Sequence, residues 1–72
     1  MTDTIELNYK IKDSGYKLQF LADQLNINRA TLYNKIYNRS EFYAKEIQLL
    51  SDLLDLTSEE RESIFFNNKV DN

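Results

Sequence analysis

Apolar residues recur every three or four positions along most of this chain, which is the spacing of amphipathic helices. Five segments follow the pattern: one around Leu7 and Ile11, one from about Leu18 to Leu25, one from about Arg29 to Tyr37, one from about Ala44, and one after Thr57. No segment alternates as a strand does. Five helices with short connections predict an all-α domain.

Two of these helices carry clear end signals. Gly15 follows Ser14 and can take the left-handed conformation that ends the first helix. Thr57 precedes Glu60 by three residues, the spacing of a capping box that begins the last helix. We therefore expect a single domain over residues 1–72, ordered from about 4 to 66, with a loose polar tail over 67–72.

The apolar stripes are interpreted first as the core of this domain. The expected core residues are Leu21, Leu25, Ile27, Leu32, Ile36, Ile47, Leu50 and Leu54. Among the tyrosines, Tyr9, Tyr16 and Tyr43 are expected to be half-buried. Tyr33 and Tyr37 are four residues apart on the third helix and are expected to be exposed.

Composition argues against catalysis and against a cofactor. The 72 residues contain no cysteine and no histidine, and Gly15 is the only glycine, so neither a thiolate metal site nor a glycine-rich phosphate loop is expected. So small a helical domain also has little room for a closed cleft that binds a small-molecule substrate. No apolar run approaches the roughly 18 residues that span a bilayer. We expect a cytoplasmic protein that is not an enzyme and does not contact membranes.

The most informative stretch is "LADQLNINRATLYNKI", residues 21–36, where the chain must reverse between two helices. Asn26 is the best non-glycine residue for a left-handed turn position, and Ile27 can lie beneath the corner. Asn28 is a good N-cap for the helix that follows. Small Ala22, four residues before Asn26, leaves space for the approach of that helix.

This stretch resembles the helix-turn-helix of the Cro and repressor family of phage and bacterial regulators. In addition, "LLSDLLDLTSEERESIFF" is similar to the last two helices of small Cro-like proteins from temperate phages of Gram-positive bacteria. The resemblance covers most of residues 5–66 and implies a five-helix, lambda-repressor-like DNA-binding domain in the cytoplasm of a bacterial host. Asn26 replaces the usual turn glycine, Lys17 replaces a capping serine or threonine, and Leu18 replaces a glutamine that contacts phosphate.

The resemblance makes the third helix the recognition helix, whose N-terminal residues approach base edges in the major groove. Arg29 suits guanine, Asn34 suits adenine, and Ala30 suits a thymine methyl group. The full set of expected base-reading residues is Asn28, Arg29, Ala30, Tyr33 and Asn34. The expected phosphate contacts are Lys17, Gln19, Thr31, Lys35, Asn38 and Arg39. The alternative is that these are ordinary solvated polar residues.

Charge is distributed unevenly along the chain. The net formal charge is −3, but residues 1–45 hold seven basic and five acidic residues, whereas residues 46–72 hold two basic and seven acidic residues. Between Tyr16 and Arg39 the only acidic residue is Asp23, whereas four residues are basic: Lys17, Arg29, Lys35 and Arg39. Four cations give weak DNA binding by counterion release, so a homodimer that presents two reading helices would bind better.

Two functions therefore remain open. The first is a small transcriptional regulator of a lysis–lysogeny genetic switch that binds operator DNA. The second is a protein-binding modulator of repression, an anti-repressor that binds the cognate phage repressor and alters or masks its DNA binding. Aromatic anchors and acids complementary to a basic surface would serve the second function: Tyr33, Tyr37, Phe42, Tyr43, Glu46, Asp52 and Asp55. Phe42 and Tyr43 are alternatively loop residues packed on the core, and the acids a solvated helix face.

Overall fold

The computed structural model describes residues 1–67, and within them it has five α-helices and no strand. The helices are α1 (Thr4–Ser14), α2 (Leu18–Gln24), α3 (Arg29–Ile36), α4 (Ala44–Leu53) and α5 (Ser58–Phe65). The all-α domain expected from the apolar periodicity is confirmed. The predicted helix boundaries agree with the observed ones to within about two residues wherever both ends were given.

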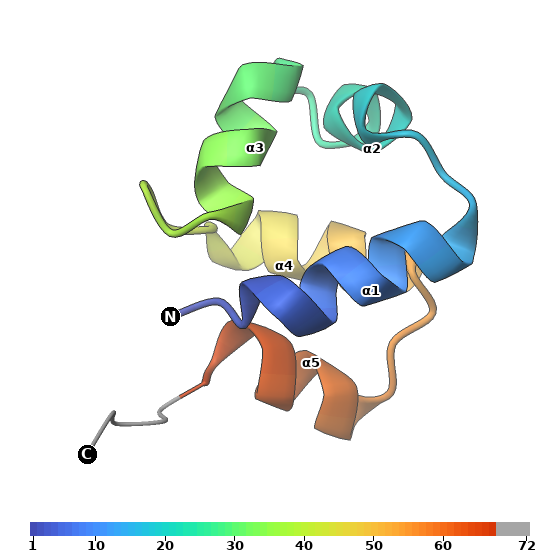
Figure 1. Cartoon of the computed structure of the whole chain (residues 1–72), viewed down its shortest axis with the longest axis vertical. Coiled ribbons are helices and arrows are strands. Elements are labelled where there is room, and N and C mark those ends of the chain that lie inside the picture. Colours follow the sequence, from blue (N-terminus) through green and yellow to red (C-terminus); the bar gives the residue numbers. More distant parts are fainter. Residues whose placement is uncertain (68–72) are drawn as a thin grey trace.

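The helices are arranged around α1, which crosses the middle of the molecule (Figure 1). α1 packs against α3 and α5, α4 packs against α2 and α5, and α2 packs against α3. Figure 1 shows α2 and α3 together on one side of α1 and α5 on the opposite side. As a result, α2 and α3 form one end of the molecule, away from the acidic C-terminal helix.

The core is built from the inward faces of all five helices. Seven of the eight predicted core residues are buried, and the eighth, Ile27, is half-buried against the same cluster. The remaining buried apolar residues are Leu7, Ile11, Ala22, Ile64 and Phe65. Each large apolar side chain that is fully buried stabilises the domain by roughly 1.5–3 kcal/mol.

The predicted helix ends are confirmed. Gly15 has φ 80° and ends α1 in the left-handed conformation. At the start of α5, Glu60 N donates to Thr57 Oγ1 at 3.1 Å and Thr57 N donates to Glu60 Oε1 at 2.9 Å, forming the capping box. A similar contact that the sequence analysis did not predict begins α4, where Tyr43 N donates to Glu46 Oε1 at 2.8 Å.

The N-terminal residues join helices that are distant in sequence. Asp3 N donates to the carbonyl oxygen of Ile64 at 2.7 Å, which connects the start of α1 to α5. Thr4 Oγ1 donates to the carbonyl oxygen of Ile36 at 2.6 Å, which connects α1 to the end of α3. The segment therefore fixes α3 relative to α5.

Some expectations about exposure are wrong. Tyr9, Tyr16 and Tyr43 were expected to be half-buried, but 65%, 40% and 70% of their surfaces are exposed. Tyr9 lies on the outer face of α1, and Tyr16 and Tyr43 lie next to helix ends, where neighbouring side chains cover only part of each ring. The tail expected over 67–72 lies, apart from Asn67, outside the described residues. Within the described part of the chain, no helix is long and apolar enough to cross a membrane.

Candidate functional site

The turn between α2 and α3 has the backbone geometry that the sequence indicated. Asn26 has φ 59°, the left-handed conformation, directly after the end of α2. Ile27 N donates to the carbonyl oxygen of Ala22 at 3.0 Å, which closes the turn over α2. Ala22 is fully buried, so its small side chain allows α3 to lie close to α2.

The start of α3 is capped by Asn28. Its Oδ1 accepts a hydrogen bond from Thr31 N at 2.7 Å, which satisfies one of the free N–H groups of the first turn. With the cap in place, the first turn of α3 presents Arg29 and Ala30 to solvent. The turn and the cap thus set the direction in which α3 begins relative to α2.

A shallow, open groove lies between α2 and α3. It has a volume of about 270 Å³ and is lined by Leu18, Arg29, Ala30, Tyr33 and Asn34. Four of these five residues belong to the set predicted to read bases, so the fold brings most of that set together. The fifth, Leu18, is half-buried against the core and gives the groove an apolar wall.

The outer part of α3 carries two aromatic rings and a cation. The ring centroids of Tyr33 and Tyr37 are 4.5 Å apart, and the Arg39 guanidinium lies 5.6 Å from the Tyr33 ring. Arg39 Nη1 also donates to Asn34 Oδ1 at 3.4 Å. Tyr37 OH accepts a hydrogen bond from Asn8 Nδ2 of α1 at 3.0 Å, which restrains its ring.

Lys35 is not the surface cation that the sequence analysis expected. Its Nζ lies 2.6 Å from Glu46 Oε1 and 3.9 Å from the centroid of the Tyr43 ring, and the residue is only 5% exposed. Lys35 and Glu46 therefore neutralise each other inside the domain. Neither charge is exposed in this structure, so the phosphate contact expected of Lys35 and the partner contact expected of Glu46 stay predictions that would require the ion pair to open.

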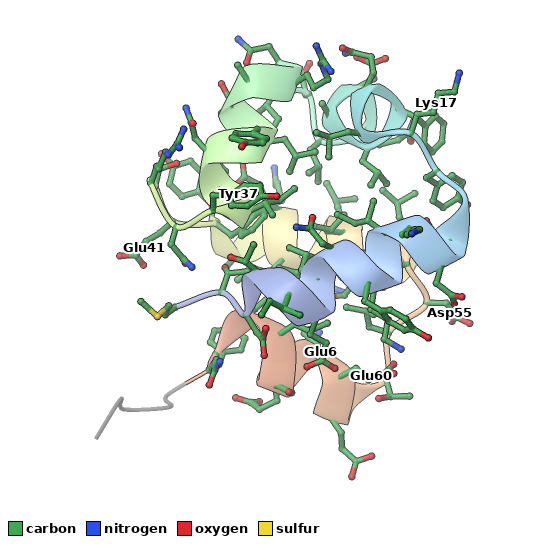
Figure 2. The ribbon with its side chains drawn as sticks, in the orientation of Figure 1. Glu6, Lys17, Tyr37, Glu41, Asp55 and Glu60 are labelled. Carbon is green, nitrogen blue, oxygen red and sulfur yellow. The ribbon has the colours of Figure 1, made fainter. Side chains whose placement is uncertain are left out.

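The other residues expected to contact phosphate differ in exposure and in whether their side chains already form hydrogen bonds within the domain. Lys17 and Arg39 are exposed, and Lys17 points outward at the start of α2 (Figure 2). The Gln19 side chain donates to Asp23 Oδ1 at 2.9 Å, and Thr31 is half-buried. Asn38 uses its side chain within the fold: Oδ1 accepts from Thr2 N and Nδ2 donates to Thr2 O, both at 2.9 Å.

The residues expected to contact a protein partner do not form one surface. Tyr33 and Tyr37 are each 42% exposed on α3, whereas Tyr43, Asp52 and Asp55 are exposed on and around α4. Phe42 is half-buried and packs edge-on against Phe65, with centroids 5.3 Å apart. The alternative in which Phe42 is a packed loop residue is therefore confirmed.

Burial of Lys35 changes the electrostatics of this end of the molecule. Between Tyr16 and Arg39, the exposed cations are Lys17, Arg29 and Arg39, and the only acidic residue is Asp23.

Exposed aromatic side chains also occupy this end of the molecule. In addition to Tyr33 and Tyr37, Tyr16 and Phe20 stack with centroids 4.9 Å apart, and each is 40% exposed. The Tyr16–Phe20 pair was not predicted, because Tyr16 lies before the start of α2, where the helical i, i+4 rule does not apply.

No group of three or more acidic, histidine or cysteine side chains that could hold a metal ion occurs among residues 1–67. No protein-family model, no curated protein and no solved structure matches this chain. The groove residues together with Tyr37 and Arg39 form what we call the α2–α3 surface, the candidate functional site of this chain.

Proposed function

We propose that this chain is a small regulator of a phage-type genetic switch, and that its α2–α3 surface binds a protein partner, the cognate repressor. The observation that supports a protein over DNA is the buried ion pair between Lys35 and Glu46, which removes one of four expected cations from this surface. Phosphate contacts supply most of the affinity of DNA-binding domains, so their loss is costly to that function.

The remaining chemistry of the surface suits a protein interface. The rings of Tyr33 and Tyr37 contact each other at an angle of 32°, and Arg39 lies over the Tyr33 ring. Tyrosine and arginine are enriched among the residues that dominate binding energy at protein interfaces. The net charge of −3 resides in the C-terminal part of the chain, whereas Lys17, Arg29 and Arg39 remain exposed at this end, so the surface would complement an uncharged or acidic patch of the partner.

The test is complex formation between the purified chain and the repressor encoded beside it, without DNA. We expect a stable complex by isothermal titration calorimetry. Tyr33→Ala should weaken it by at least about 30-fold, the effect of losing an interface anchor. Leu49→Ala is the matched control, because Leu49 is 39% exposed on α4, away from this surface. Unchanged affinity of the Tyr33 variant would contradict the proposal.

Operator DNA is the second candidate, and the groove supports it. Arg29, Ala30 and Asn34, suited to guanine, thymine and adenine, line one hollow on α3. Three exposed cations limit the phosphate contacts to about three per domain, so log K should fall with log salt with a slope of about −3 per domain. Asn34→Ala should relax base preference without changing that slope.

An electrophoretic mobility assay on switch-region DNA at low salt distinguishes the two candidates. Retardation of that DNA by the chain alone, with a preference that Asn34→Ala removes, would support direct DNA binding. No retardation at low salt, together with a repressor complex that forms without DNA, would support the protein partner.

A further inference from the structure

The outer face of α1 carries an apolar stripe that nothing in the described chain covers. Ile5 is 84% exposed and Tyr9 is 65% exposed, one turn apart on the same side of the helix. Leu7 and Ile11, on the opposite side, are buried in the core. A β-branched aliphatic residue at such exposure is unusual, since burying it would stabilise the protein.

A hollow lies further along the same face. It has a volume of about 380 Å³ and is lined by Tyr9, Lys12 and Asp13. At a rise of about 1.5 Å per residue, its centre lies roughly 10 Å along the helix from Ile5. One helix therefore presents both a projecting apolar side chain and an open recess that is large enough to admit one.

From these features we infer that α1 is the contact surface for a second copy of this chain, with the two α1 helices antiparallel across a two-fold axis. In this arrangement Ile5 of each copy enters the hollow of the other, so both stripes are covered at once. An isologous interface of this kind needs a surface that is complementary to itself, and a knob and a recess on one helix meet that requirement.

The charges of α1 favour the antiparallel direction. Asp3 and Glu6 lie at the start of the helix, and Lys12 lies in its last turn. Antiparallel pairing brings Lys12 of each copy toward the acidic start of the other, with Asp13 offsetting part of this attraction, whereas parallel pairing would bring the two acidic starts together. Opposed helix dipoles act in the same direction. The inference does not rest on the proposed function, because the α1 stripe lies outside the α2–α3 surface.

The interface is small. α1 has 11 residues, a length of about 16 Å, and so covers less than the roughly 800 Å² per partner that a stable complex buries. We therefore expect a weak dimer that forms at high concentration.

Sedimentation velocity of the whole chain from micromolar to millimolar concentration tests the dimer. We expect the weight-average sedimentation coefficient to rise from the monomer value toward that of a dimer. Ile5→Lys should raise the dissociation constant at least about tenfold, and the exposure of Ile5 leaves folding intact. Leu49→Lys, at another exposed apolar position, should leave the constant unchanged. A monomer at all concentrations, or equal effects of both variants, would overturn the inference.

Cross-linking tests the direction of pairing, and the chain is suited to it because it contains no cysteine. A mixture of Ile5→Cys and Tyr9→Cys chains should form the mixed disulfide several-fold faster than Ile5→Cys forms a disulfide with itself. The antiparallel register separates the two copies of position 5 beyond the roughly 7 Å that a disulfide can bridge. Faster self-linkage of Ile5→Cys would exclude this arrangement.

Discussion

The ammonium group of Lys35 lies inside the domain because its neighbours compensate for lost hydration. Glu46 Oε1 is 2.6 Å away, and the Tyr43 ring covers the other side at 3.9 Å. The same carboxylate oxygen accepts the hydrogen bond from Tyr43 N that caps α4. One residue therefore both begins a helix and neutralises a buried charge, and this pair is the reason that the α2–α3 surface is short of cations.

Glu46→Gln separates these two roles, since the amide oxygen can still accept the hydrogen bond from Tyr43 N. We expect the substitution to lower the free energy of unfolding by about 3 kcal/mol, because it leaves the Lys35 charge buried without a counterion. Urea denaturation measures the loss. Glu41→Gln is the control at an exposed position and should change stability by less than about 0.5 kcal/mol. Equal losses of unfolding free energy in the Glu46→Gln and Glu41→Gln variants would mean that the Lys35–Glu46 ion pair does not stabilise the domain.

At the scale of helices, α1 and α5 are held together by polar contacts around their buried faces. Lys10 forms an ion pair with Glu60, and Ser63 Oγ donates to Glu6 Oε1 at 3.0 Å. Figure 2 shows Glu6 and Glu60 where α1 and α5 face each other. The hydrogen bond from Lys10 lowers the pKa of Glu60 below its ordinary value of 4.5, and that from Glu60 raises the pKa of Lys10 above 10.5. This contact therefore depends on pH at both extremes.

The direction of each pKa change predicts how Lys10→Gln behaves. Because the Glu60 pKa is lowered in the folded state, its contribution is complete above pH 4.5 and is lost as pH falls through the folded value. Because the Lys10 pKa is raised, its contribution is complete below pH 10.5 and is lost as pH rises through the folded value. We expect Lys10→Gln to lower the urea midpoint at neutral pH and to match the wild type in strong acid. Lys45→Gln, at an exposed position of α4, should show no such pH dependence.

At the scale of the whole molecule, the N-terminal segment connects both ends of the fold. Asn38, at φ 64°, holds Thr2 through two hydrogen bonds of 2.9 Å, and Asp3 N bonds to the end of α5. The end of α3 is thereby fixed to the C-terminal helix through residues at the opposite end of the sequence. Residues 2–4 thus stabilise the position of the α2–α3 surface although they lie outside it.

Asn26 and Asn38 both have the left-handed backbone conformation, so substituting each in turn tests the contribution of the Asn38–Thr2 hydrogen bonds. Asn38→Gly keeps the backbone conformation but removes both hydrogen bonds to Thr2, so we expect a loss of about 2 kcal/mol in the free energy of unfolding. Asn26→Gly makes the same chemical change at φ 59°, where no side-chain hydrogen bond is lost, and should stay within about 0.5 kcal/mol. Thermal denaturation of the two variants measures the difference. Equal stability would contradict a role for the Asn38 side chain in holding the N-terminus.

The sequence by itself determined the features that depend on residues within about one helical turn. The five helices, the left-handed positions at Gly15 and Asn26, and the cap between Thr57 and Glu60 all rest on contacts between residues at most four positions apart. Backbone sterics and helical periodicity fix such contacts locally. Most core residues could be predicted for the same reason, because the spacing of apolar residues along each helix identifies the face that points inward.

Only the tertiary structure decided which polar and aromatic residues are available at the surface. Lys35 and Glu46 are 11 positions apart, Phe42 and Phe65 are 23 apart, and Thr2 and Asn38 are 36 apart. No local pattern links the members of these pairs. A charged or aromatic residue on a helix reaches solvent only if no other element packs over it, and that depends on how the helices meet. For this reason the positions of α2 and α3 were predictable from the sequence, whereas the charge exposed on the α2–α3 surface depends on how the helices pack together.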